Sequence, residues 1–294
     1  MFDRRPALRS SARLASIGFL PILLTACLTE GRYVGYDESR SLDTQGRVVT
    51  FVDLYETGRK SVADYLAELP SAEREGLETM LARTASACAR LEIIDQRSGM
   101  DYSQISGSAV LVRGSASKCF VATAGHSFSG VSSEDVTLTL RDGSDVDAAM
   151  ISSSFAEFDS SSRDWAVLAV SEGSSDLPAL TTHEPVPGEL AFVLSYPNEM
   201  GVNEAGQVVY GHAYASSPLA PIVTVARVRD DSPLALDPIA GSLAMGGASG
   251  GAIVNRKGEL IGILTGSGWA ATKDGAEYWI HGATIAAFEE HLAR

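Results

Sequence analysis

The sequence is poor in cysteine, with three residues in 294, and this limits the metal sites that the chain can form. No spacing of Cys and His matches a zinc site, and the helical metalloprotease motif H-E-x-x-H is absent. The acidic stretch with Asp142, Asp145 and Asp147 lacks the spacing of a calcium-binding loop and is typical of a solvated turn. We therefore expect a protein that binds no metal and needs no cofactor.

Basic residues are also scarce, because 23 Lys and Arg stand against 37 Asp and Glu. The formal net charge is −14, and the chain after residue 26 carries −17, since residues 1–26 contain four Arg and one Asp. A surface this acidic repels the phosphate backbone of DNA or RNA. We therefore expect no nucleic acid among the partners.

A long apolar run is missing as well. The apolar stretch at residues 14–24 follows a basic segment and is shorter than a typical membrane-spanning helix. Leu24-Thr25-Ala26-Cys27 comes next and resembles a bacterial lipobox, in which the Cys receives a lipid. We predict a lipoprotein-type signal peptide at residues 1–26 and a lipid anchor at Cys27. The alternative is an ordinary signal peptide beside a chance Cys.

A lipid anchor sets the predicted location of the protein, because acyl chains hold a protein on a bilayer. A lipobox implies the periplasmic side of the bacterial envelope. Leu28 follows the Cys where an Asp would favour retention in the inner membrane, so the outer membrane is mildly favoured. The membrane is therefore a predicted partner, reached through Cys27.

Residues 27–90 are predicted to form a tether followed by a helical extension. Residues 28–60 are polar and lack a period, apart from one short strand expected near residues 48–52. Helices are expected at residues 61–69 and 72–90, and the second has an apolar stripe at helical spacing that ends at Cys88. Cys88 is either a buried thiol on this stripe or the disulfide partner of Cys119.

From residue 91 the pattern changes to short apolar runs separated by Gly- and Ser-rich turns, which is typical of an all-β barrel or sandwich. One amphipathic helix is expected near the C-terminus, at residues 283–292. The predicted strands cover residues 109–112, 119–123, 136–140, 166–170, 189–194, 207–213, 222–228, 251–254 and 260–264.

His126, Asp164 and Ser249 each lie in a short apolar or Gly-rich setting and follow one another in that order. A serine hydroxyl is a weak nucleophile unless a base takes its proton, and an imidazole held by a carboxylate is such a base. Glycines beside Ser249 let the backbone turn sharply, so the N–H groups of Gly247 and Ser249 are the expected oxyanion donors. Together these residues predict a nucleophilic hydrolase.

Three segments resemble the motifs of chymotrypsin-like (trypsin-like) serine proteases of the bacterial branch. Residues 121–126 (VATAGH) are similar to the segment around the catalytic His, and residues 164–168 (DWAVL) to the strand that follows the catalytic Asp. Residues 247–254 (GASGGAIV) are similar to the turn around the nucleophile. The resemblance covers about residues 90–294. It implies His126 as general base, Asp164 as the residue that orients it, and Ser249 as nucleophile.

The resemblance also implies a fold, with two antiparallel six-stranded β-barrels and the triad in the cleft between them. His126 and Asp164 are expected in the first barrel and Ser249 in the second, with the boundary near residues 173–188. The predicted fold class is therefore all-β, with an N-terminal helical extension and a C-terminal helix around a protease domain at residues 91–294.

Two positions depart from the digestive members of that family. Ala248 stands where those proteases have the Asp that pairs with a new N-terminus, so this route of activation is not available here. Ser127 stands where many members have Cys, so the disulfide at that position is absent too. Both departures concern activation and cross-linking, and the triad is intact.

Chain order separates this prediction from two other hydrolase folds. Residues 247–251 also fit the G-x-S-x-G nucleophile elbow of α/β-hydrolases. That fold needs an Asp and then a His after the serine, in more strand–helix units than residues 250–294 provide. A subtilisin-type order needs an Asp before the His, and neither Asp95 nor Asp101 has a suitable setting.

The substrate pocket is predicted from the strand after the serine. Residues 260–268 resemble the strand that lines the primary pocket in the family, and the small residues Thr265, Gly266 and Ser267 would leave that pocket open. Its floor is expected near Leu243, where no acidic residue favours Lys or Arg. His281 is either a core histidine or a pocket residue of the kind that some glutamate-specific relatives use.

Two functions of different classes follow from these observations. The first is a serine endopeptidase that cuts protein or peptide substrates through an acyl-enzyme intermediate. The second is a catalytically silent homologue that acts as a lipid-anchored binding module. The intact triad and the intact glycines favour the peptidase.

Overall fold

The computed structural model describes residues 40–42, 48–50, 60, 62–95, 103–115, 118–129, 136–155, 163–170, 176–196, 199–202, 208–211, 221–241, 247–272 and 275–292. The predicted signal peptide, Cys27 and Leu243 lie outside these residues, as does most of the predicted tether. Within the tether, β1 (Arg40–Leu42) pairs with β2 (Val48–Thr50), where one short strand was expected.

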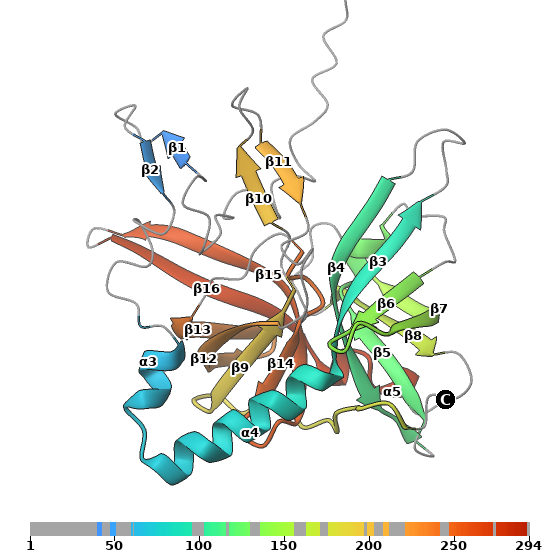
Figure 1. Cartoon of the computed structure of the whole chain (residues 1–294), viewed down its shortest axis with the longest axis horizontal. Coiled ribbons are helices and arrows are strands. Elements are labelled where there is room, and N and C mark those ends of the chain that lie inside the picture. The colour runs from blue at the N-terminus through green and yellow to red at the C-terminus, as the bar shows by residue number, and fades with distance from the viewer. Residues whose placement is uncertain are drawn as a thin grey trace, which may run out of the picture.

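Two closed antiparallel β-barrels of six strands each form the body of the protein, which confirms the predicted fold class (Figure 1). The first barrel has the order β3-β4-β5-β8-β7-β6 and the second β12-β13-β16-β15-β14-β9. The strands of the first are β3 (Cys88–Asp95), β4 (Ser103–Arg113), β5 (Cys119–Thr123), β6 (Val136–Leu140), β7 (Asp145–Ser154) and β8 (Trp165–Val170). The strands of the second are β9 (Leu190–Ser195), β12 (Ile222–Asp231), β13 (Leu234–Gly241), β14 (Ala252–Asn255), β15 (Leu260–Thr272) and β16 (Gly275–Thr284).

The burial of the strands follows their sequence pattern. β6 alternates buried Val and Leu with half-buried Thr, because successive side chains point to opposite faces of a sheet. β9 and β14 are buried along their whole length. One hydrophobic cluster joins residues of both barrels, such as Leu138 of the first and Phe192 of the second. The barrels therefore share a continuous apolar contact.

The strand predicted at residues 207–213 does not belong to a barrel, which corrects that expectation. β11 (Val208–Gly211) pairs with β10 (Glu199–Val202) in a separate two-stranded sheet. Conversely, β3, β7, β13 and β16 have no counterpart among the predicted strands. In β7 only Ala148 of ten residues is buried, so the strand lacks the apolar alternation on which such a prediction depends.

Two helices, α3 (Val62–Ala67) and α4 (Ser71–Ala87), precede the first barrel. The predicted extension of the second helix to residue 90 is wrong, because Cys88 has extended backbone (φ −88°, ψ 144°) and begins β3. The apolar stripe of the helix continues directly into the buried Ala89 and Leu91 of the strand, which conceals the boundary. None of the described helices is long and apolar enough to cross a membrane.

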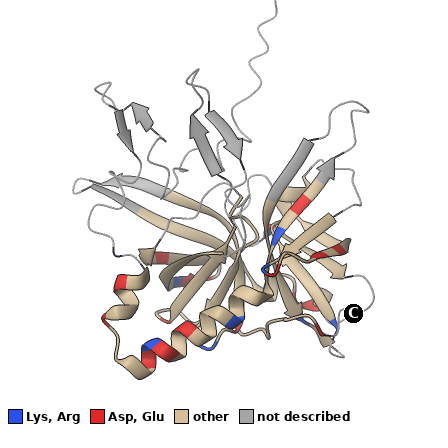
Figure 2. Ribbon diagram, viewed as in Figure 1, with Lys and Arg blue, Asp and Glu red and all other residues tan. Residues whose placement is uncertain are grey.

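Helix α4 connects the two barrels. Acidic and basic residues are interspersed along it (Figure 2), while Leu77 and Met80 are buried. Arg83 donates a hydrogen bond of 2.5 Å to the carbonyl of Lys257, in the turn between β14 and β15. The helix thus contacts the second barrel through Arg83 and runs into the first strand of the first barrel.

The C-terminal helix is shorter than predicted. β16 continues to Thr284, a 3-10 turn spans Ile285–Ala287, and α5 covers only Glu289–Leu292. The rings of His291 and Trp165 lie 4.9 Å apart, so this helix packs against the strand that follows Asp164.

Cys88 and Cys119 are buried free thiols. They lie on β3 and β5, which flank β4 on opposite sides, where they pair with Val110 and Arg113. Two strand spacings amount to about 10 Å, which exceeds the Cα separation of about 7 Å that a disulfide can span. Burial raises the pKa of Cys88 to about 12 and that of Cys119 to about 11. The structure therefore supports the buried-thiol alternative.

The chain crosses from β8 to β9 near the predicted boundary, and this linker binds both barrels. Leu180 accepts a hydrogen bond from the N–H of Arg113 (2.7 Å) and donates one to the carbonyl of Leu111 (2.9 Å), both on β4. The N–H of His183 then donates to the carbonyl of Leu260 on β15 (2.9 Å). The linker is thus part of the contact between the barrels.

Candidate active site

The first barrel brings His126 and Asp164 together. His126 lies in a short 3-10 helix (Gly125–Phe128) after β5, and Asp164 directly precedes β8. Because β5 and β8 are antiparallel neighbours, with Thr123 opposite Ala166, the end of one strand meets the start of the other. The predicted base and its predicted partner therefore come from adjacent strand ends.

Both carboxylate oxygens of Asp164 bind His126. The backbone N–H of His126 donates to Oδ1 at 2.8 Å, and Nδ1 of the ring lies 2.7 Å from Oδ2. A carboxylate at Nδ1 favours the tautomer with the proton on that nitrogen, which leaves the Nε2 lone pair available as a base. The Asp164 side chain is 12% exposed and that of His126 is 22% exposed, so the pair is largely shielded from water while the ring remains accessible.

Gly125 allows this pair to form. A Cβ at residue 125 would lie 2.3 Å from the carbonyl oxygen of Ser154 and 2.7 Å from that of Trp165. Neither backbone atom can yield without moving its strand, so the close approach of the His126 segment to β7 and β8 requires glycine.

The second barrel presents Ser249 on a tight turn. Gly247 and Gly250 have φ of 82° and 86°, a region that L-residues with a side chain rarely adopt. Three successive carbonyls in this turn are hydrogen-bonded. That of Gly247 accepts from the Ser108 hydroxyl (3.0 Å), that of Ala248 from the N–H of Gly251 (3.0 Å), and that of Ser249 from the N–H of Ser108 (2.8 Å).

These hydrogen bonds orient the peptide groups of the turn. In a trans peptide the carbonyl and the following N–H point in opposite directions. Because the carbonyl of Ala248 is turned toward Gly251, the N–H of Ser249 points the other way. Such a backbone N–H, fixed before any substrate binds, is the kind of donor that an oxyanion hole needs.

The turn around Ser249 lies against the first barrel, close to the segment of His126. A Cβ at Gly250 would lie 2.0 Å from the carbonyl oxygen of Ser108 and 2.2 Å from the hydroxyl of Thr123. Thr123 is the last residue of β5 and stands three residues before His126. The structure thus joins His126 to Asp164 directly, and places the Ser249 turn beside the strand that carries the histidine.

The residues predicted to line the substrate pocket lie on β15. Thr265 sits at a β-bulge between Leu264 and Gly266, and within the described residues its buried hydroxyl has no hydrogen-bond partner. A Cβ at Gly266 would meet nothing within 4 Å, so the strand is open on that side. Ser267 is half-buried.

His281 pairs with Gly266 across the two strands. The indole N–H of Trp279 donates to Nε2 of His281 at 2.6 Å. Burial lowers the pKa of His281, and the positive charge of Arg229 lowers it further. The neutral imidazole is therefore the form that this environment favours.

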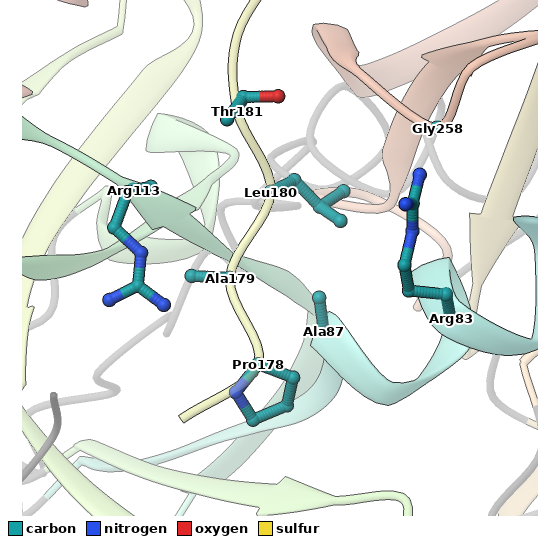
Figure 3. A pocket seen from close by; sticks show the side chains of 8 residues that line it. All are labelled: Arg83, Ala87, Arg113, Pro178, Ala179, Leu180, Thr181 and Gly258. Atoms are coloured by element: carbon teal, nitrogen blue, oxygen red, sulfur yellow. The ribbon is translucent and has the colours of Figure 1, made fainter. Parts of the chain in front are cut away.

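A separate pocket lies between α4 and the linker (Figure 3). Its two arginines serve the fold, because Arg83 binds the carbonyl of Lys257 and Arg113 that of Leu177. Figure 3 shows the two guanidinium groups pointing in different directions. None of the predicted site residues lines this pocket, which is formed by Arg83, Ala87, Arg113, Pro178, Ala179, Leu180, Thr181 and Gly258.

Sequence reasoning missed Ser108 and Thr123, the two hydroxyl residues at the contact between the barrels. The hydroxyl of Thr123 donates to the carbonyl of Ser108 at 2.7 Å, and both residues are buried. The signal in the sequence is faint. Each is a polar residue at one end of an apolar run, and no spacing rule connects either of them to Ser249.

The protein has the architecture of a two-barrel serine peptidase. One six-stranded barrel carries a His–Asp pair, and the other carries a serine turn that is bounded by glycines and lies against the first barrel. A comparison with known families agrees. The model of the trypsin-like peptidase domain matches residues 107–263, which is more than half of the chain, and the protein belongs to this family. No curated protein matches the chain.

Proposed function

We propose that the protein is a serine endopeptidase in which His126, Asp164 and Ser249 form the catalytic triad. The observation that carries this proposal is the His126–Asp164 pair on one barrel beside the Ser249 turn of the other. Membership of the trypsin-like peptidase family supports it. The buried Ala248 supports the expectation that no acidic side chain beside the nucleophile takes part in activation.

The proposed reaction passes through an acyl-enzyme. Ser249 Oγ attacks the peptide carbonyl while His126 Nε2 takes the hydroxyl proton, and Asp164 stabilises the imidazolium that forms. The N–H groups of Ser249 and Gly247 stabilise the oxyanion. His126 then gives the proton to the leaving amine as the C–N bond breaks. Water, activated by the same imidazole, hydrolyses the ester and regenerates Ser249.

The proposed substrate is a protein or peptide in extended conformation. Thr265, Gly266 and Ser267 lie on a strand whose open side at Gly266 leaves room for a substrate side chain. A backbone bound next to such a strand is held at several points, so the scissile carbonyl can be positioned for attack.

A serine-directed fluorophosphonate probe tests the proposed activity. We expect the probe to label the wild-type protein at Ser249 and to leave Ser249→Ala unlabelled, with peptide mass spectrometry to identify the site. Asp142, which binds Ser144 in an exposed turn, offers a control, and Asp142→Asn is expected to react like wild type. A folded wild-type protein that is not labelled at any pH between about 5 and 9 would instead favour the silent binding module.

The lipid anchor at Cys27 is a second part of the proposal and is supported by the lipobox alone. The mature protein would sit on the periplasmic side of the bacterial envelope, with the outer membrane favoured by Leu28. Wild-type protein is expected in the membrane fraction after a high-salt wash, and Cys27→Ala in the soluble fraction. A Cys27→Ala protein that stays in washed membranes would contradict the anchor.

A further inference from the structure

Ser108 on β4 is 1% exposed and uses every one of its polar groups at the contact between the barrels. Its hydroxyl donates to the carbonyl of Gly247 at 3.0 Å and accepts from the N–H of Tyr196 at 2.7 Å. Its own N–H donates to the carbonyl of Ser249 at 2.8 Å, and its carbonyl accepts from the hydroxyl of Thr123 at 2.7 Å. One residue therefore binds four others on three different segments.

These contacts link the two halves of the proposed site. Thr123 ends β5, and the chain from there reaches His126 within three residues. Gly247 and Ser249 belong to the serine turn of the second barrel, and Tyr196 directly follows β9 of the same barrel. A displacement between the barrels at this point would move the nucleophile relative to its base.

Ser108 binds the peptide groups on either side of the one that carries the N–H of Ser249. Ser108 holds the carbonyls of Gly247 and Ser249, which flank the peptide carrying the N–H of Ser249. With both flanking carbonyls fixed, this peptide cannot rotate freely, so the direction of its N–H is fixed. The turn is thus preorganised by a residue of the opposite barrel.

Few side chains can replace this hydroxyl. The Gly247 carbonyl needs a donor and the N–H of Tyr196 needs an acceptor, and the one hydroxyl of Ser108 serves both. A hydroxyl has one proton to donate and lone pairs to accept, whereas a methyl group has neither. Without it, the buried N–H of Tyr196 and the carbonyl of Gly247 would each lose this partner.

We propose that Ser108 is a positioning residue for the peptidase, and that its hydroxyl holds the Ser249 turn in register with His126. This inference rests on the proposed function, because a positioning role has meaning only if Ser249 reacts. Ser108 itself does not touch the reacting atoms. It acts through the backbone of Gly247 and Ser249.

The test compares the rate of fluorophosphonate labelling in Ser108→Ala with that in wild type, using folded protein recovered by size exclusion. We expect a decrease of about 10- to 100-fold, since misplacement of a reacting group by about 1 Å can cost about 100-fold. On a cleavable peptide the loss should appear in kcat, with KM nearly unchanged. The pH at half-maximal activity should not move, because the His126–Asp164 pair is untouched.

Asn255 provides the matched control. It is also buried, and its side-chain oxygen also binds two backbone groups, the N–H of Lys257 and that of Glu259, but at the far end of β14. Asn255→Ala should lower Tm as Ser108→Ala does and yet label within about twofold of wild type at a temperature well below Tm. Ser108→Cys, which keeps a weak donor and acceptor, should recover part of the lost rate.

The outcomes are distinct. Labelling of wild type with an equal rate in Ser108→Ala would overturn the positioning role and leave the proposed function intact. An equal loss of rate in Asn255→Ala would also overturn it, because the effect would then follow stability alone. If Ser108→Ala does not fold, the rate of Ser108→Cys is compared with that of Ser108→Gly. A higher rate in Ser108→Cys supports the role, and equal rates overturn it. An unlabelled wild type would remove the proposed function and this inference together.

Discussion

His126 on the first barrel is held by a side chain, since both carboxylate oxygens of Asp164 bind it. Ser249 on the second barrel is held through the backbone of its turn, since its own carbonyl and those of Gly247 and Ala248 all accept hydrogen bonds between glycines of positive φ. The first half of the site therefore depends on chemistry that one substitution can remove without changing shape. The second half depends in addition on the backbone shape of the turn, which a side chain added at Gly250 would disturb.

The difference predicts how each half fails. An isosteric change at the carboxylate should abolish activity and leave the fold intact. A change at a glycine of the serine turn should destabilise the protein and thereby remove activity. Asp164→Asn and Gly250→Ala should thus separate on a plot of activity against free energy of unfolding.

The largest effect is expected from Asp164→Asn. The amide cannot hold the imidazole in the required tautomer or stabilise its cation, so the rate should fall by about 10⁴-fold. The midpoint of urea unfolding should change little, because Asn has the size of Asp. Labelling kinetics and equilibrium unfolding on the same samples check both statements. A residual rate within tenfold of wild type would show that the activity of His126 does not depend on the Asp164 carboxylate.

Gly250→Ala tests the second barrel. The new Cβ would meet the carbonyl oxygen of Ser108 at 2.0 Å in a backbone of φ 86°, so steric and backbone strain combine. We expect a loss of about 3 kcal/mol in free energy of unfolding, together with loss of labelling.

Gly143→Ala is the control, because Gly143 has φ 83° with nothing within 4 Å of the Cβ position. It should cost about 1 kcal/mol and retain full activity. Equal losses in the two variants would mean that the barrel contact contributes nothing.

His281 gives a smaller effect and a useful contrast with His126, because it binds an indole N–H and not a carboxylate. Its pKa lies below the ordinary value of 6.5, through burial first and Arg229 second. As the pH falls below about 6.5, His281 is therefore protonated in the unfolded chain while it is still neutral in the folded protein. The stability associated with neutral His281 is present above pH 6.5 and is lost as the pH falls below it.

His281→Gln should accordingly reduce the drop in Tm between pH 7.5 and pH 5.5. The exposed His183 is the control, and His183→Gln should leave that drop unchanged. Thermal unfolding at several pH values measures the difference. If His281→Gln shows the full wild-type drop, other groups account for the acid sensitivity.

The sequence allowed both the fold class and the His126–Asp164 contact to be predicted, each for its own reason. The segments around His126, Asp164 and Ser249 have short motifs because the chemistry restricts their residues. The fold class followed from those motifs together with the frequent short apolar runs. β7 was not predicted because nine of its ten residues are not fully buried, and the end of α4 was missed because apolar residues continue through Cys88.

Ser108 shows a different limit. The partners of its hydroxyl and carbonyl stand 15, 88 and 139 positions away in the chain, so its role exists only after both barrels have closed. A local pattern identifies a serine before an apolar run, but it does not identify the partners of that serine. Long-range hydrogen bonds of this kind depend on strand register, which a single sequence does not reveal.

The strands that close the barrels have a practical consequence. The family match covers residues 107–263, so β3 and β16 lie outside it. β3 pairs with β4 and β6, and β16 pairs with β13 and β15, so each completes the ring of its barrel. A fragment cut at the limits of the match would carry two open sheets with four unpaired edges. Such edges recruit strands from other molecules, and the fragment would be expected to precipitate as sheet-rich aggregate, although it contains every residue of the proposed triad.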